Sequence, residues 1–163
     1  MLFFAFTTEA TVWTVENGES IQDAIDSAST WDTIQVEPGT YVEYLEVNKG
    51  LTIEGTGEGV VLRTPGSEER LVQISSPDVT LKGLTFEAID EVIEHTAVYM
   101  DGDIRDIQVR NCTFRDVETS LRIDDDSMNV VVANCTFENV RDYGIYSGAS
   151  NPVGLYFRVL SIG

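Results

Sequence analysis

Grouped aspartates are the sequence feature whose residue types and spacing best fit chemistry. Asp101 and Asp103 lie 23 residues before Asp124 and Asp126, and Asp125 stands between the second pair. On neighbouring copies of a 23-residue repeat these carboxylates would share one turn, where they repel unless a cation or salt screens them. The pattern indicates a Ca²⁺ site formed by all five, or sugar-contacting acids with Asp101, Asp124 and Asp126 as catalytic candidates. A turn covered with hydrated acids explains the same pattern.

Three further side chains are candidate ligand-binding groups. Tyr99 and Tyr143 carry aromatic rings that can stack on sugar rings. Arg122 occupies the position equivalent to Tyr99 one repeat later. Packing between neighbouring repeats accounts for the two tyrosines equally well, so both interpretations stay open.

A histidine and two sequons complete the set of candidate sites. His95 lies in segment 87–96, where one repeat is five residues longer than the next. With Glu91 and Glu94 it offers ligands for a metal ion, although an ordinary loop histidine fits the same observation. Asn111 and Asn134 each begin an Asn-Cys-Thr sequon and are glycosylation candidates. A structural need for Asn in a left-handed backbone explains both positions as well.

An internal repeat must position these side chains. The motif Asn-Cys-Thr-Phe begins at Asn111 and recurs at Asn134, and Gly83 begins the related Gly-Leu-Thr-Phe. A short β-rich run precedes each copy, and the first residue is one that tolerates a left-handed backbone. The positions where we therefore expect a sharp bend are Gly55, Gly83, Asn111 and Asn134.

After each bend, alternation predicts which side chains point into the core. Phe86, Phe114 and Phe137 are expected to point inward, one above the other. Cys112 and Cys135 are expected to lie beside each other in the same core. Two cysteines are too few for a disulfide scaffold, so we interpret them as free thiols, with a disulfide as the alternative.

The repeat predicts an all-β fold, a parallel β-helix of about five coils. A second strand column recurs at the same spacing, at 98–100, 121–123 and 144–146. One such unit cannot bury its apolar face alone, whereas stacked units form a continuous core with strands about 4.8 Å apart. An antiparallel sandwich is the structural alternative, but hairpin connections would not keep Gly and Asn at one period.

The chain is expected to form one domain with a helical cap. Ser20–Ala28 carries an apolar stripe and a capping-box pattern, which predicts a short amphipathic α-helix that closes the N-terminal end of the stack. The expected boundaries are an extension over 1–13, the helix over 20–29, coils over 33–148 and an irregular terminal strand over 149–163. That apolar strand is an open edge, which predicts self-association or assembly with a partner.

Three segments resemble the N-terminal region of right-handed β-helix proteins of the pectate-lyase-like superfamily. They are Ser20–Ile25, Asp32–Tyr41 and Leu51–Gly55. The resemblance extends over roughly residues 14–150 and implies a right-handed β-helix. The superfamily includes pectin methylesterases, polysaccharide lyases and hydrolases, and also non-catalytic periplasmic and cell-surface proteins. Its members are usually longer, so a fragment or a reduced form is expected.

The catalytic residue sets that this resemblance implies do not map onto the sequence. The esterase pattern of two Asp, an Arg and Gln on successive coils has no match, and the paired Asp with Gly-His-Gly of the hydrolases is absent. Arg110 or Lys82 would be a lyase-like base, but both share an outward column with Glu54. A ladder of ion pairs is the preferred interpretation of that column.

The charge of the chain excludes several classes of partner. The 163 residues carry 28 Asp and Glu against 10 Lys and Arg, a net charge of −18, and 42% are hydrophobic. This balance argues against nucleic acid and anionic lipid, and no apolar run approaches the roughly 20 residues that span a bilayer. The acids are spread along the chain, which favours the surface of a halophilic protein over cation binding or steering toward a basic partner.

The expected function is that of a non-catalytic, extracellular module or one on a cell or virion surface. It would present a rigid face to a polysaccharide, a surface glycan or a structural partner. The alternative is a polysaccharide-active enzyme, a lyase, hydrolase or esterase, that uses the aspartate column. No cofactor other than Ca²⁺ is expected. Fold does not fix function here, because the same architecture hosts both classes.

Overall fold

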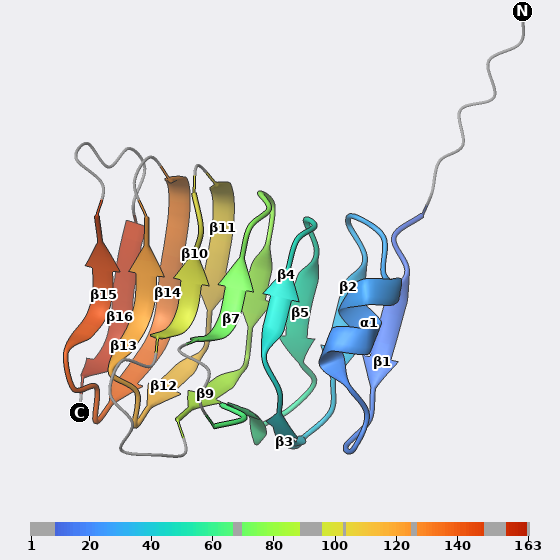
Figure 1. Ribbon diagram of the computed structural model, residues 1–163, viewed down its shortest axis with the longest axis horizontal. Coiled ribbons are helices and arrows are strands. Elements are labelled where there is room, and N and C mark those ends of the chain that lie inside the picture. Colours follow the sequence, from blue (N-terminus) through green and yellow to red (C-terminus); the bar gives the residue numbers. More distant parts are fainter. Residues whose placement is uncertain are drawn as a thin grey trace, which may run out of the picture.

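The computed structural model shows a stack of parallel strands that winds through several turns (Figure 1). It describes residues 9–66, 70–88, 96–102, 104–124, 127–148 and 156–162. Every strand pairing within these residues is parallel, as the repeat predicted. The antiparallel sandwich is thereby excluded.

Each turn of the stack contributes strands to three faces. The first face holds β1 (Val12–Val15), β2 (Thr33–Val36), β5 (Thr52–Gly55), β8 (Thr80–Lys82) and β11 (Arg105–Arg110). The second holds β3 (Gly39–Val42), β6 (Val60–Arg63), β9 (Thr85–Glu87) and β12 (Thr113–Arg115). The third is a separate five-stranded sheet of β4 (Leu45–Val47), β7 (Arg70–Ile74), β10 (Thr96–Met100), β13 (Thr119–Ile123) and β15 (Tyr143–Ser147).

Two strands join or extend these faces near the C-terminal end. The long strand β14 (Met128–Glu138) pairs with β11 over its first half and with β12 over its second, so it runs through the bend. The last strand, β16 (Tyr156–Ile162), pairs with β14 through two register shifts. Its Tyr156 and Phe157 are exposed. Association through this terminal edge stays a prediction.

The predicted bend is confirmed at three of its four positions. Gly83, Asn111 and Asn134 have φ values of 66°, 52° and 56°, in the left-handed region. The expectation for Gly55 was wrong, because its φ is not positive. A Cβ at Gly55 would lie 2.4 Å from the carbonyl oxygen of Gly83, so close approach of the next turn, and not handedness, requires a glycine there.

The core consists of side chains stacked along the axis of the β-helix. Phe86 and Phe114 have ring centroids 4.9 Å apart, and Phe114 and Phe137 are 5.3 Å apart, with nearly parallel rings. Cys112 and Cys135 are buried free thiols, as expected. Because every turn adds the same kind of inward side chain, the stack forms one continuous core that fixes the register of the outer faces.

The helix α1 (Ile21–Ser27) lies beside β4 in the first turn, where later turns have a strand of the third face (Figure 1). Ile21 and Ile25 are fully buried against the core. The Gln22 side chain accepts a hydrogen bond from the Glu46 N–H at 2.9 Å, so it satisfies a backbone group on the open edge of β4. Within the described residues, no helix is long and apolar enough to cross a membrane.

Candidate functional site

The outer side of the five-stranded sheet carries rows of side chains that the strand register aligns. One row consists of Gln73, Tyr99, Arg122 and Tyr146, on β7, β10, β13 and β15. The neighbouring row consists of Arg70, Thr96, Thr119 and Tyr143. Since the backbones are joined by parallel hydrogen bonds, these side chains repeat at the strand spacing on a rigid support.

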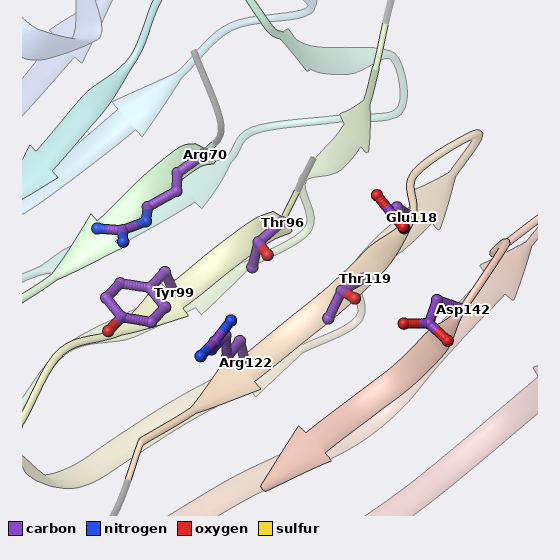
Figure 2. Close-up of a pocket in the computed structure, with 7 residues that line it drawn as sticks. All are labelled: Arg70, Thr96, Tyr99, Glu118, Thr119, Arg122 and Asp142. Carbon is purple, nitrogen blue, oxygen red and sulfur yellow. The ribbon is translucent and has the colours of Figure 1, made fainter. Parts of the chain in front are cut away.

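Arginines and tyrosines from neighbouring strands interact on this surface. The guanidinium of Arg70 lies 3.8 Å from the ring centroid of Tyr99, and that of Arg122 lies 5.8 Å from the same centroid (Figure 2). Arg122 is also 5.5 Å from the ring centroid of Tyr146. These distances fit cation–π attraction, which orders the long arginine side chains in place. We call Arg70, Tyr99, Arg122, Tyr143 and Tyr146 the arginine–tyrosine face.

The structure gives the two predicted tyrosines different surroundings. Tyr99 is only 9% exposed and is covered by Arg70, so its ring packs between strands, the alternative to sugar stacking considered above. Tyr143 is 47% exposed, and its ring centroid lies 5.3 Å from that of Tyr146, which is also exposed. The exposed aromatic rings of this face therefore lie on β15.

Tyr99 also links the face to the acidic turn. Its hydroxyl donates a short hydrogen bond to Oδ2 of Asp124, and this bond, aided by burial, raises the pKa of Tyr99 above its ordinary value. The other oxygen of Asp124 lies 3.7 Å from Nε of Arg122. Asp101, one turn earlier, accepts a hydrogen bond from the Gln73 amide at 2.8 Å. Asp124 thus holds Tyr99 of the face in position, and Asp101 holds the neighbouring Gln73.

The remaining members of the aspartate cluster, Asp103, Asp125 and Asp126, lie outside the described residues, as does His95. Among the residues that the structure describes, no three His, Cys, Asp or Glu side chains come together as metal ligands. The Ca²⁺ site and the catalytic role of Asp101, Asp124 and Asp126 therefore stay predictions.

A depression with a volume of about 280 Å³ opens on the arginine–tyrosine face. It is lined by Arg70, Thr96, Tyr99, Glu118, Thr119, Arg122 and Asp142, all shown in Figure 2. Oε2 of Glu118 is buried and has no hydrogen-bond partner among the described residues. The depression combines two guanidinium groups, three hydroxyls and two carboxylates, which suits a ligand with many hydroxyl groups and at least one acid.

Sequence reasoning missed Arg70, Tyr146 and Glu118. Tyr146 follows Tyr99 and Arg122 in the same column, so the 23-residue spacing would have found it. The 23-residue spacing could not identify Arg70, because a longer connection precedes β10. Arg70 therefore pairs with Thr96 at a different sequence spacing. Glu118 is not part of a strand, so alternation gave no signal for it.

The other candidates lie away from this face. Lys82 forms an ion pair with Glu54 at 3.0 Å, whereas Arg110 donates to Gln108, so the predicted ladder forms only in part. A hydrogen bond from Gln35, followed by that from Lys82, holds the pKa of Glu54 below its ordinary value. Asn111 is exposed and Asn134 is half-buried. Their left-handed backbone explains the residue type, and glycosylation stays a prediction.

Comparison with known proteins agrees with this architecture. A family model described as the right handed beta helix region matches residues 49–158. A segment of 65 residues is 38% identical to part of a cell surface glycoprotein of Methanothermus fervidus and covers 39% of this chain and 11% of that protein.

Solved structures share the fold at low sequence identity. The PL6 family alginate lyase AlyGC superposes on 85% of this chain with a TM-score of 0.65 and 22% identity, over 21% of its own chain. A pectin methylesterase in complex with a hexasaccharide superposes on 80% of this chain with a TM-score of 0.55 and 16% identity, over 55% of its own chain. This chain therefore spans well under two thirds of the length of each relative.

Proposed function

We propose that this chain, which belongs to the family of right-handed β-helix region proteins, is a non-catalytic carbohydrate-binding module. The module would lie outside the cell or on a cell or virion surface. The observation that carries the proposal is the arginine–tyrosine face, where two guanidinium groups and three aromatic rings are aligned by the strand register. The location is supported by the similarity to a cell surface glycoprotein.

The chemistry of the face favours an acidic glycan. Arg70 and Arg122 bring two guanidinium groups to one depression, which also holds the carboxylates of Glu118 and Asp142. A guanidinium group binds a carboxylate through two parallel hydrogen bonds, and exposed rings such as Tyr143 and Tyr146 offer flat surfaces to sugar rings. Alginate and pectin, named for the two similar structures, are acidic polysaccharides, which supports this choice of ligand.

The rigidity of the support favours binding with little reorganisation. Tyr99 is held by Arg70 and by its hydrogen bond to Asp124, and Gln73 is held by Asp101. A ligand that docks on side chains already fixed in position costs less conformational entropy than one that must order them.

The alternative function is a polysaccharide-active enzyme that uses Asp101, Asp124 and Asp126. Its support is that both similar solved structures are named as polysaccharide-active enzymes. The hydrogen bonds that Asp101 accepts from Gln73 and Asp124 accepts from Tyr99 support a positioning role for both aspartates.

Calorimetric titration of the protein with hexagalacturonate or hexamannuronate distinguishes the two functions. Each titration is run once in the presence of Ca²⁺ and once in the presence of a chelator. Product formation is followed in the same samples by chromatography. We expect binding without cleavage, and a loss of at least about tenfold in affinity for Arg122→Ala, since Arg residues near the centre of a face dominate binding. Arg122 is half exposed, so its truncation leaves the core intact.

The matched control is Arg105→Ala, which removes the same charge from an exposed arginine on β11, on a different face. It should leave the affinity nearly unchanged. Cleaved hexasaccharide would establish the enzyme instead, and equal affinity for Arg122→Ala and the unchanged protein would show that this face does not bind the ligand.

A further inference from the structure

Trp31 combines two features that are each unusual for a tryptophan. Its side chain is 63% exposed, and its φ is 75°, in the left-handed region. A left-handed backbone is unfavourable for any residue with a Cβ, and a large exposed apolar side chain gains little from the fold. An observed outlier of this kind is a reason to look for a function.

The fold explains the backbone at this position but does not explain the residue type. The register of β2, β5, β8, β11 and β14 places Trp31 in one turn column with Gly50, Asp78, Asp106 and Asn129. In that column Asp78, Asp106 and Asn129 also have positive φ values, of 61°, 60° and 55°. Asp and Asn tolerate this conformation, whereas Trp does not belong to that group. The conformation of the turn therefore does not explain why residue 31 is a tryptophan.

Hydrogen-bonding groups surround a hollow beside the indole. Its volume is about 180 Å³, and its lining includes Trp31, Thr52, Thr80, Asp78, Asp106 and Gln108. The hollow is lined by the indole of Trp31, the hydroxyl-bearing Thr52 and Thr80 and the carboxylate of Asp78. Asp106 accepts one hydrogen bond, from Asn129, and Gln108 accepts one, from Arg110, which leaves a free carboxylate oxygen and a free amide NH₂.

We propose that this hollow is a second carbohydrate site, selective for a neutral sugar ring. The C–H face of a pyranose fits the electron-rich face of the indole, while carboxylate and amide groups pair with its hydroxyls. Asp78 and Asp106 would repel a uronic acid, and the described residues that line this hollow include no arginine or lysine to offset them. We call this the Trp31 site; its floor is formed by the first face of the β-helix, so it is independent of the arginine–tyrosine face.

Tryptophan emission and calorimetry test the site in the full chain. The probes are neutral hexasaccharides of β-1,4-linked glucose, of β-1,4-linked mannose and of β-1,4-linked galactose. We expect at least one of them to bind with a dissociation constant below about 1 mM and to shift the emission of exposed Trp31 to shorter wavelength. Trp13, the second tryptophan, donates to Asp32 at 3.0 Å and is not among the residues that line the hollow, so we expect its emission to respond less than that of Trp31.

Two variants assign the binding to this site. Trp31→Gly removes the indole and suits the left-handed backbone, so the protein should stay folded while the affinity falls at least about tenfold. Asp78→Asn keeps the shape and should weaken binding several-fold. Arg122→Ala should leave neutral binding unchanged, and Trp31→Gly should leave the binding of acidic hexasaccharides unchanged.

The inference is overturned if none of the three neutral hexasaccharides binds at about 5 mM, or if Trp31→Gly binds them as tightly as the unchanged protein. Tighter binding of hexagalacturonate at the Trp31 site than of every neutral hexasaccharide would also contradict it. Since each face has its own variant and its own ligand class, failure of the Trp31 site leaves the proposed function intact, and the reverse holds as well.

Discussion

A single carboxylate, that of Asp32, joins residues 11–13 to the loop that follows α1 at the N-terminal end of the β-helix. It accepts hydrogen bonds from the Thr11 N–H at 2.7 Å, from the Ser29 N–H at 2.8 Å and from the Trp13 indole at 3.0 Å. Those bonds, led by the one from Thr11, hold the pKa of Asp32 below its ordinary value. The ionised form is therefore the one that the folded chain prefers.

This preference makes the stability of the first turns depend on pH. Because the pKa of Asp32 is lower in the folded chain than in the unfolded chain, its contribution is fully present above the unfolded value of about 4 and is lost as the pH falls through the folded value. We expect Asp32→Asn to be less stable than the unchanged protein at pH 7, with a difference that shrinks toward pH 3. Urea unfolding across this range measures the difference, in which the other acids cancel. A difference independent of pH would contradict the assignment.

At the scale of elements, α1 is anchored by a residue far away in the sequence. Glu43 accepts hydrogen bonds from the Ser20 hydroxyl at 2.8 Å and from the N–H groups of Ile21 and Gln22 at 2.8 and 3.2 Å. These N–H groups belong to the first turn of the helix, where backbone N–H groups have no acceptor within the helix itself. The carboxylate also opposes the positive end of the helix dipole.

Removing this carboxylate should loosen the cap. We expect Glu43→Ala to lower the free energy of unfolding by about 1–3 kcal/mol, because two backbone donors and a hydroxyl lose a charged acceptor. The matched control is Glu46→Ala, which removes an exposed glutamate from the neighbouring strand β4 and should change stability little. Chemical unfolding monitored by circular dichroism measures both. Equal losses for the two variants would mean that charge alone, and not the cap, sets the effect.

Sequence patterns predicted the strands and the bend, because those depend on residues that recur at one spacing. Phe114 above Phe137, and Asn111 and Asn134 at the bend, follow directly from the 23-residue period. The Glu43 anchor and the Arg70 contact with Tyr99 could not be predicted, since each joins residues whose spacing is set by connections of irregular length. Gly55 shows another limit of sequence patterns, because glycine is required there by close packing against the next turn and not by a left-handed backbone.

At the scale of the whole molecule, the net charge of −18 favours unfolding by self-repulsion unless salt screens it. We propose that the chain is adapted to a high-salt environment, as the even spread of its acids predicts. The described ion pairs are few, and Lys82 with Glu54 and Arg63 with Glu87 are both partly exposed, so direct pairing compensates little of the repulsion.

Salt should therefore stabilise the fold. The screening length falls from about 10 Å at 0.1 M to about 3 Å at 1 M salt, so repulsion between neighbouring turns, about 4.8 Å apart, is screened only at the higher concentration. We expect the midpoint of urea unfolding to rise steadily over this range, with NaCl and KCl acting alike. A midpoint that is constant or falls with added salt would show that the acids serve another purpose.

The parallel register of the five-stranded sheet spaces equivalent side chains at a constant interval along the axis of the β-helix. Arg122 and Tyr146 occupy the same place on successive turns, so groups for contact recur along the axis at a constant interval. A linear polymer that lies along this axis meets one further contact for each turn it passes. Affinity should then increase in steps with ligand length and stop increasing when the ligand is longer than the row of turns. Insertion of a whole turn would lengthen the binding face without altering any existing contact.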